Sequence, residues 1–304
     1  MKQIEIVEVG PRDGLQNELA LISTEYKLEL IRRAIDYGAR RIEVTSFVNP
    51  DRVPQLADAE ELAAMLPKRD DVTYIGLVLN RRGVERALAT ERIDELGAVC
   101  VTSNTFGNKN QGQNSDESLA SAIEVVALGK QAGRSAQITI ATAFGCPFEG
   151  EVSIDRVVEM AKRAADTSPR EIALADTIGV GVPNRVSEMV SRVREAILPL
   201  PVRVHFHNTR NTGLANVWAA VAEGASTVDA SLGGLGGCPF APGAAGNVPT
   251  EDVVYLLERA GMTTGLSLPA LVDTAHWFTD VMGRPLPAMV SKAPAFPSNY
   301  GKDN

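Results

Sequence analysis

The chain contains few cysteines, no long apolar run and no excess of positive charge, and each absence excludes a class of protein. Its three cysteines, Cys100, Cys146 and Cys238, are too sparse and odd in number for a disulfide framework, which favours a reducing compartment. No apolar segment approaches the length of a membrane span, and Met1–Glu5 does not begin a signal peptide. We therefore expect a cytoplasmic protein that does not act in a membrane.

Acidic residues outnumber basic ones, so that the chain carries a formal net charge of −8. No basic stripe with interleaved aromatic residues is present, which disfavours a nucleic-acid partner. An anionic ligand would need local basic groups or the N-termini of helices. The hydrophobic content of 44% is ordinary for a globular enzyme with a buried core. A chain of 304 residues has room for one large α/β domain or two smaller ones.

Eight apolar, β-branched segments alternate with segments of helical periodicity. The predicted strands are Ile4–Val9, Arg41–Val48, Val72–Leu79, Glu95–Thr102, Gln137–Thr142, Glu171–Ala175, the segment around Val202–His207, and Thr227–Leu232. The predicted helices are Ser23–Tyr37, Ala57–Leu66, Arg82–Ala89, Glu117–Ala132, Ile154–Ala165, Val186–Ile197, Gly213–Ala222, Glu251–Ala260 and Leu268–Met282, and Ser103–Ser115 is expected to be a polar loop.

Strand starts recur every 25–40 residues or so, which is the spacing of a (β/α)8 TIM barrel. A doubly wound open sheet is the alternative, but eight regular units without an obvious switch point favour the barrel. No linker divides the sequence, so we expect one catalytic domain over residues 1–304. The barrel would occupy about residues 4–260, and a C-terminal helix and tail would follow in 261–304.

Active sites of TIM barrels lie at the carboxyl ends of the strands. Polar side chains follow these ends throughout the sequence: Arg12, Asp13, Glu43, Ser46, Asn80, Thr102, Asn104, Thr142, Asp176, His205, His207, Cys238 and Asn247. Any one of them alone could be a solvated loop residue. Because the carboxyl ends of all eight strands meet at one face, the set together predicts a site.

Two of the three histidines, His205 and His207, stand two residues apart in the seventh predicted strand. Alternate side chains of a strand share a face, so the two imidazoles would converge. Asp13 would add an anion, and Asn247 could add an amide oxygen. This donor set suits Mg²⁺ or Mn²⁺ better than a thiolate-rich structural zinc site. Two solvated histidines on an edge strand, and a turn residue at Asn247, are the structural alternatives.

Six segments, in the same order along the chain, resemble segments of 3-hydroxy-3-methylglutaryl-CoA lyase and, more broadly, of the DRE-TIM metallolyases. The resemblance covers roughly Ile4 to Gly283. The segments are Val9–Glu18, Ile42–Phe47, Asp176–Gly179, His205–His207, Gly234–Phe240 and Gly246–Asn247.

The resemblance implies a metal-dependent retro-aldol cleavage of 3-hydroxy-3-methylglutaryl-CoA to acetyl-CoA and acetoacetate, a step of leucine degradation, by a homodimer. By motif position, the metal ligands would be Asp13, His205, His207 and Asn247. Arg12 would stabilise the enolate oxygen, and Cys238 would be the catalytic cysteine of a mobile loop. Glu43 and Asp176 match acidic residues that support the site.

The residues are compatible with this chemistry. Arg12 offers a permanent cation where negative charge would develop on the thioester oxygen, although a salt bridge with Asp13 or Glu43 is the simpler role. Cys238 lies among glycines, and its thiol could accept or donate a proton. The glycines lack the G-x-G-x-x-G spacing of a dinucleotide site. Lys109, Arg81 and Arg82 are candidates for binding the phosphates of CoA, with ordinary solvated charges as the alternative.

The sequence departs from the lyase pattern at Asn208–Thr212, at Asn104 and at Leu19. Arg210 in particular could bind or move a carboxylate of the substrate. A lyase of the same mechanism that acts on another branched 3-hydroxyacyl-CoA, such as a citramalyl-CoA-like thioester, is therefore an alternative. A homocitrate- or isopropylmalate-type condensing synthase is disfavoured because such synthases are longer and lack the Gly-Gly-Cys-Pro loop. A non-catalytic binding protein on a degenerate barrel is the remaining alternative.

Overall fold

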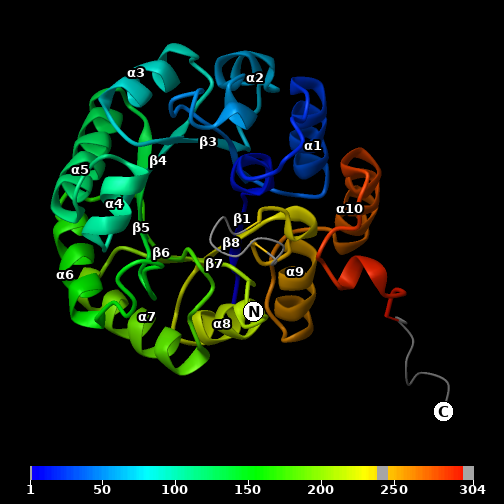
Figure 1. The fold of residues 1–304 in the computed structure, drawn as a ribbon. Coiled ribbons are helices and arrows are strands. Elements are labelled where there is room, and N and C mark those ends of the chain that lie inside the picture. Colours follow the sequence, from blue (N-terminus) through cyan, green and yellow to red (C-terminus); the bar gives the residue numbers. More distant parts are fainter. Residues whose placement is uncertain (1, 238–245, 297–304) are drawn as a thin grey trace.

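A computed structural model describes residues 2–237 and 246–296 of the chain. Eight parallel strands hydrogen-bond in sequence order, and β1 pairs with β8 to close the barrel (Figure 1). The strands are β1 (Glu5–Glu8), β2 (Arg41–Ser46), β3 (Thr73–Val78), β4 (Glu95–Val101), β5 (Ser135–Ala141), β6 (Ile172–Asp176), β7 (Val202–Phe206) and β8 (Thr227–Ala230). The predicted (β/α)8 barrel is confirmed, and the open sheet is excluded.

Helices surround the barrel, and all except α4 correspond to predicted helices (Figure 1). They are α1 (Thr24–Asp36), α2 (Ala59–Met65), α3 (Arg81–Ala89), α4 (Asn104–Asn110), α5 (Ser115–Gln131), α6 (Ile154–Ala165), α7 (Pro183–Ile197), α8 (Gly213–Ala222), α9 (Thr250–Arg259) and α10 (Leu268–Met282). The extra helix α10 packs outside the ring against α1 and α9. Within the described residues, we find no helix with the length and apolar character that a membrane crossing requires.

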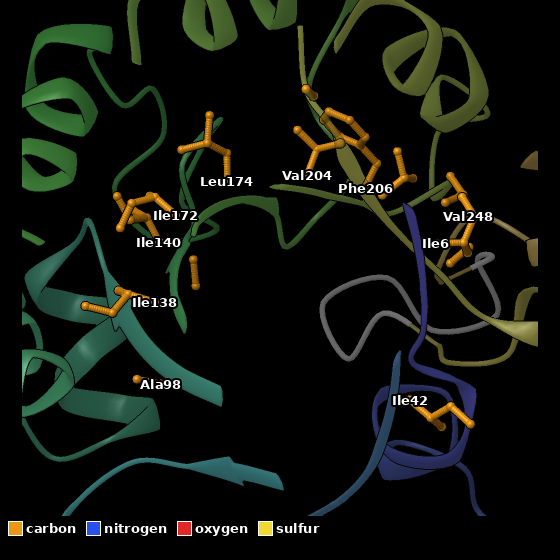
Figure 2. Close-up of a cluster of buried hydrophobic side chains, with 14 of the residues drawn as sticks. Ile6, Ile42, Ala98, Ile138, Ile140, Ile172, Leu174, Val204, Phe206 and Val248 are labelled. Atoms are coloured by element: carbon orange, nitrogen blue, oxygen red, sulfur yellow. The ribbon is translucent and has the colours of Figure 1, made fainter. Parts of the chain in front are cut away.

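Successive side chains of each strand point alternately outward, toward the helices, and inward, toward the barrel axis. Apolar residues at one set of positions, including Ile42, Ile138 and Val204, form the buried layer between strands and helices (Figure 2). The opposite set of side chains faces the inside of the barrel and includes charged residues. Arg41 of β2, for example, forms a salt bridge with Glu95 of β4 at 2.6 Å across the barrel interior. A charged barrel interior must be paired internally to be tolerated.

One helix was not predicted, because Ser103–Ser115 was expected to be a polar loop. Helix α4 forms there despite several residues of low helix propensity. The Ser103 hydroxyl caps it by accepting a hydrogen bond from the Phe106 amide at 3.2 Å. The Phe106 side chain is buried, and Gly107 lets the helix approach Gln113 closely. The cap and this packing outweigh the weak propensity.

Candidate metal and catalytic site

The turn after β1 places two polar side chains at the mouth of the barrel. The amides of Arg12, Asp13 and Gly14 all donate hydrogen bonds to the Val9 carbonyl, at 2.8–3.2 Å, and form a single π-helical turn over Gly10–Gly14. Such turns are rare and occur often at functional sites. Here the turn directs the Asp13 carboxylate toward β7.

His205 and His207 lie on the interior face of the chain at the end of β7, with ring centroids 5.2 Å apart. The Nε2 atoms of both rings stand 3.8 Å from Asp13 Oδ2. These three side chains offer ligand atoms that all lie within 4.8 Å of one another. The structure therefore brings together three of the four residues predicted to bind the metal.

The fourth predicted ligand, Asn247, follows the Gly-rich segment in the sequence and joins the same cluster. Its Nδ2 donates to Asp13 Oδ2 at 2.8 Å and to the Leu235 carbonyl at 3.1 Å. An isolated antiparallel bridge links it to His207. Just before it, the backbone approaches Gly236 so closely that a Cβ on Gly246 would fall 1.1 Å from the Gly236 carbonyl oxygen. Only glycine fits at 246.

The donor set fits a divalent cation. A separation of 3.8 Å between Nε2 and the carboxylate is too long for a hydrogen bond. It lies within the span of two atoms that share a cation with bonds of about 2.1 Å. A carboxylate, two imidazoles and an amide are ligands that a hard or borderline divalent cation such as Mg²⁺ or Mn²⁺ accepts, and the described group contains no thiolate.

Charge and burial set the protonation of these groups before a metal binds. Burial alone would raise the pKa of Asp13, but Arg12 and the two histidines hold it well below its usual range. Burial, and then the charge of His205, lower the pKa of His207 to about 4. Burial also opposes charge on His205, yet its hydrogen bond to Asp229 and the charge of Asp13 raise its pKa. Asp13 is thus anionic and His207 neutral near pH 7, as ligation requires.

Arg12 forms salt bridges with Asp13 and with Glu43, the two acidic residues named as its structural partners in the sequence analysis. One Nη donates to Asp13 Oδ1 at 2.5 Å and the other to Glu43 Oε2 at 2.7 Å. Its Nε is buried and has no partner among the described residues, so one donor is left unpaired at the mouth of the barrel. Burial raises the pKa of Glu43 in spite of the attraction of Arg12.

Asp176 ends β6 next to His205 and is fully buried. Its carboxylate accepts hydrogen bonds from the amides of Val180 and Gly181, at 2.9 and 2.8 Å, so it shapes the loop that follows β6. Burial raises its pKa. Arg210 binds the same loop, because its Nη1 donates to the carbonyls of Ile178 and Gly179. The expectation that Arg210 binds or moves a substrate carboxylate stays a prediction.

The predicted CoA-binding cations lie apart from the metal cluster. Arg81 forms an exposed ion pair with Glu124 between α3 and α5 at 2.5 Å. The ammonium of Lys109, in α4, stands 4.1 Å over the Phe148 ring. No contact joins either cation to the cluster within the part of the chain that the structure describes. Cys238 lies outside the described residues.

Sequence reasoning missed the charged residues beneath the site. The Asp229 carboxylate of β8 lies 3.1 Å from His205 Nδ1 and pairs with Arg203 at 2.5 Å. Arg203 and Arg41 then meet at Glu171, at 3.4 and 2.7 Å. The available signal was alternation: Arg203 precedes His205 by two residues on the same face of β7, and Asp229 interrupts an apolar strand.

The fold and these residues define a class, a TIM barrel with a candidate divalent-cation site at the carboxyl ends of its strands. Residues 3–277 match the family model described as HMGL-like. The chain is 41% identical to the (R)-citramalyl-CoA lyase of Chloroflexus aurantiacus, over 98% of this chain and 97% of that protein. The chain belongs to the HMGL-like family.

Solved structures agree with this assignment. The HMG-CoA lyase of Bacillus subtilis superposes with a TM-score of 0.92 and 39% identity, covering 96% of this chain and 98% of that one. An HMG-CoA lyase from Acinetobacter baumannii, in complex with coenzyme A and 3-methylmalate, gives the same TM-score and identity over 97% and 96% of the two chains. The fold and sequence similarity therefore extend over nearly the whole of each protein.

Proposed function

We propose that this chain is a metal-dependent carbon–carbon lyase that cleaves 3-hydroxy-3-methylglutaryl-CoA to acetyl-CoA and acetoacetate. The observation that carries the proposal is the cluster of Asp13, His205 and His207 beside Arg12, at the mouth of a barrel of this family. The relatives named above are all lyases of CoA thioesters. The shared reaction class supports the mechanism more strongly than it supports any one acyl group.

Asp13, His205, His207 and Asn247 would hold the cation, which we propose to be Mg²⁺ or Mn²⁺. When bound, the cation supplies a Lewis acid that acidifies the C3 hydroxyl of the substrate and fixes its orientation. The Asn247 carbonyl oxygen is the atom available for this purpose, since its Nδ2 donates to Asp13 and Leu235. The anionic Asp13 and neutral His207 need no proton loss on binding.

The reaction breaks the C2–C3 bond after the C3 hydroxyl loses its proton. The bonding electrons move to C2 and form the enolate of the acetyl thioester, while C3 becomes the ketone of acetoacetate. A proton then returns to C2 and gives acetyl-CoA. Arg12 is the described cation best suited to the enolate oxygen, because its guanidinium has five N–H donors and its two salt bridges do not use them all.

We propose that Cys238 is the acid or base that exchanges this proton, since its thiol can do either. Glu43 would act by holding Arg12, whose Nη2 donates to the Glu43 carboxylate at 2.7 Å. Asp176 would act by holding the loop after β6. Lys109 and Arg81 remain our candidates for the CoA phosphates, and each would have to leave its present partner to reach them.

Cleavage of (R)-citramalyl-CoA is the second candidate, because a relative of 41% identity carries that name. Its carboxylate stands one methylene closer to the carbinol carbon, so its cleavage gives pyruvate in place of acetoacetate. One experiment separates the two: the Mg²⁺- or Mn²⁺-loaded enzyme is given each thioester, and the keto acid is identified. Acetoacetate from the first thioester at the higher kcat/KM supports our proposal. Efficient cleavage of citramalyl-CoA alone would replace the substrate and leave the mechanism intact.

Three further features are part of the proposal. We propose that residues 1–304 form one catalytic domain, that two copies associate as a homodimer, and that the enzyme works in the cytoplasm in leucine degradation. The role in leucine degradation follows from the proposed reaction alone, and sedimentation equilibrium tests the dimer. A monomer at micromolar concentration would contradict the second point without affecting the reaction.

A further inference from the structure

Asp229 faces one of the two candidate metal-binding histidines across a strand pair. β7 and β8 are parallel neighbours, and the register sets the Cα of His205 opposite that of Asp229. The Oδ2 atom of Asp229 lies 3.1 Å from His205 Nδ1, whereas the Nε2 atom of the same ring points toward Asp13 Oδ2 at 3.8 Å. The ring is thus held from one side and faces the metal cluster with the other.

The Asp229 carboxylate is itself fixed by a second bond. Its Oδ1 accepts from Nε of Arg203 at 2.5 Å, so each oxygen has a separate partner. Arg203 precedes His205 by two residues on the same face of β7 and also contacts Glu171 at 3.4 Å. Both side chains of the pair are at least 95% buried. Because both side chains are buried, a carboxylate that turned away would lose its bond to Arg203 Nε with no water to replace it, and Arg203 would keep only its longer contact with Glu171.

The neighbouring histidine provides a natural contrast. His207 is equally buried, and its Nε2 stands at the same 3.8 Å from Asp13 Oδ2. Its Nδ1, however, has no hydrogen-bond partner among the described residues. The Nδ1 atoms of the two rings thus differ in their partners, so an effect that travels through Nδ1 should reach His205 and spare His207.

We propose that Asp229 is a positioning residue of the metal site, which fixes the proton of His205 on Nδ1 and aims the Nε2 lone pair at the cation, while Arg203 holds the carboxylate. A neutral imidazole carries one donor and one acceptor nitrogen. A carboxylate at Nδ1 makes that nitrogen the donor and leaves Nε2 as the ligand. Carboxylates in this position raise the affinity of histidine sites for metals.

The inference rests on the proposed metal site, so the first experiment measures Mn²⁺ binding and does not rely on activity. Titration by calorimetry would compare the wild-type enzyme with Asp229→Asn. The amide keeps the shape but removes the acceptor charge, and we expect the Mn²⁺ affinity to fall by about 10- to 100-fold. Excess Mn²⁺ should then restore much of the turnover, because the reacting groups are unchanged.

Glu95→Gln is the matched control. Glu95 is another fully buried carboxylate inside the barrel, paired with Arg41 at 2.6 Å, but it touches no candidate ligand. A general loosening of the barrel would weaken Mn²⁺ binding in both variants, whereas positioning through His205 weakens it in Asp229→Asn alone. Equal losses in the two variants, or no loss in Asp229→Asn, would overturn the inference. Absence of Mn²⁺ binding by the wild-type enzyme would instead refute the proposed metal site.

A second measurement needs no variant and so does not depend on how Asp229→Asn folds. The chain has only three histidines, and ¹⁵N-histidine labelling resolves the tautomer of each ring. In the Mg²⁺-loaded wild-type enzyme we expect His205 as the Nδ1–H tautomer, with His276 as a reference far from the site. Finding the His205 proton on Nε2 would contradict the positioning role directly.

Discussion

Replacing Glu251 by glutamine should remove much of the dependence of stability on pH. Glu251 lies in the first turn of α9 and is fully buried. Its Oε2 accepts one hydrogen bond from the Gly233 amide at 2.9 Å, and its Oε1 has no partner among the described residues. Burial raises its pKa from 4.5 to about 8. A carboxyl group held in this way is protonated in the folded enzyme at neutral pH.

The raised pKa gives the sign and size of the effect. Because the folded state binds this proton more tightly than the unfolded state, the stabilisation is complete below pH 4.5 and is lost as the pH rises through 8. A shift from 4.5 to about 8, at 1.36 kcal/mol per unit, corresponds to at most about 5 kcal/mol between these limits. Glutamine cannot titrate, so Glu251→Gln should lack this part of the pH dependence.

Urea unfolding at several pH values between 5 and 9 measures the difference. We expect the free energy of unfolding of the wild-type enzyme to fall more steeply with pH than that of Glu251→Gln, so that the variant gains relative stability toward pH 9. Glu258→Gln removes an exposed carboxylate from the same helix and should reproduce the wild-type slope. Parallel curves for wild type and Glu251→Gln would refute the assignment of a protonated Glu251.

Three further substitutions test the site. Gly236→Ala would put a side chain at φ 99°, with its Cβ 2.7 Å from Asn247 Nδ2, so Mn²⁺ affinity should fall. As a control, Gly133→Ala also has a positive φ but its Cβ would meet open space. It should cost only the conformational strain of about 1–2 kcal/mol. Asp13→Asn should abolish Mn²⁺ binding measured by calorimetry, and retained affinity would remove Asp13 from the ligand set. Cys238→Ala should sharply reduce turnover while Mn²⁺ binding persists, and unaffected turnover would refute the role of this thiol.

The barrel could be predicted because its signals are local and repeated. Each strand is a short β-branched run, and each helix has its own apolar face, so errors in single elements do not change the total of eight. Helix α4 was missed because its residues have low helix propensity and the burial of Phe106 is a tertiary effect, although the local cap at Ser103 was a signal that the sequence offered. Propensity alone gives no such signal.

The meeting of the candidate metal ligands could be predicted for the residues that end a strand or directly follow one. Asp13, His205 and His207 meet because parallel strands direct all their carboxyl ends to one face. Asp229 could not be found in this way, since its contact with His205 depends on the register between β7 and β8. The backbone contacts of Arg210 could not be found for a similar reason, because its acceptors at Ile178 and Gly179 lie on another loop.

The most direct test of the account is the product balance of metal-dependent cleavage. Metal-free enzyme is prepared with EDTA, divided, and incubated with 3-hydroxy-3-methylglutaryl-CoA with and without Mg²⁺ or Mn²⁺. The account predicts equal amounts of acetyl-CoA and acetoacetate in the metal-loaded sample, and loss of this activity in the metal-free sample and in His207→Ala. Cleavage that persists without metal, or a loaded enzyme that yields no acetyl-CoA from any branched 3-hydroxyacyl-CoA, would contradict it.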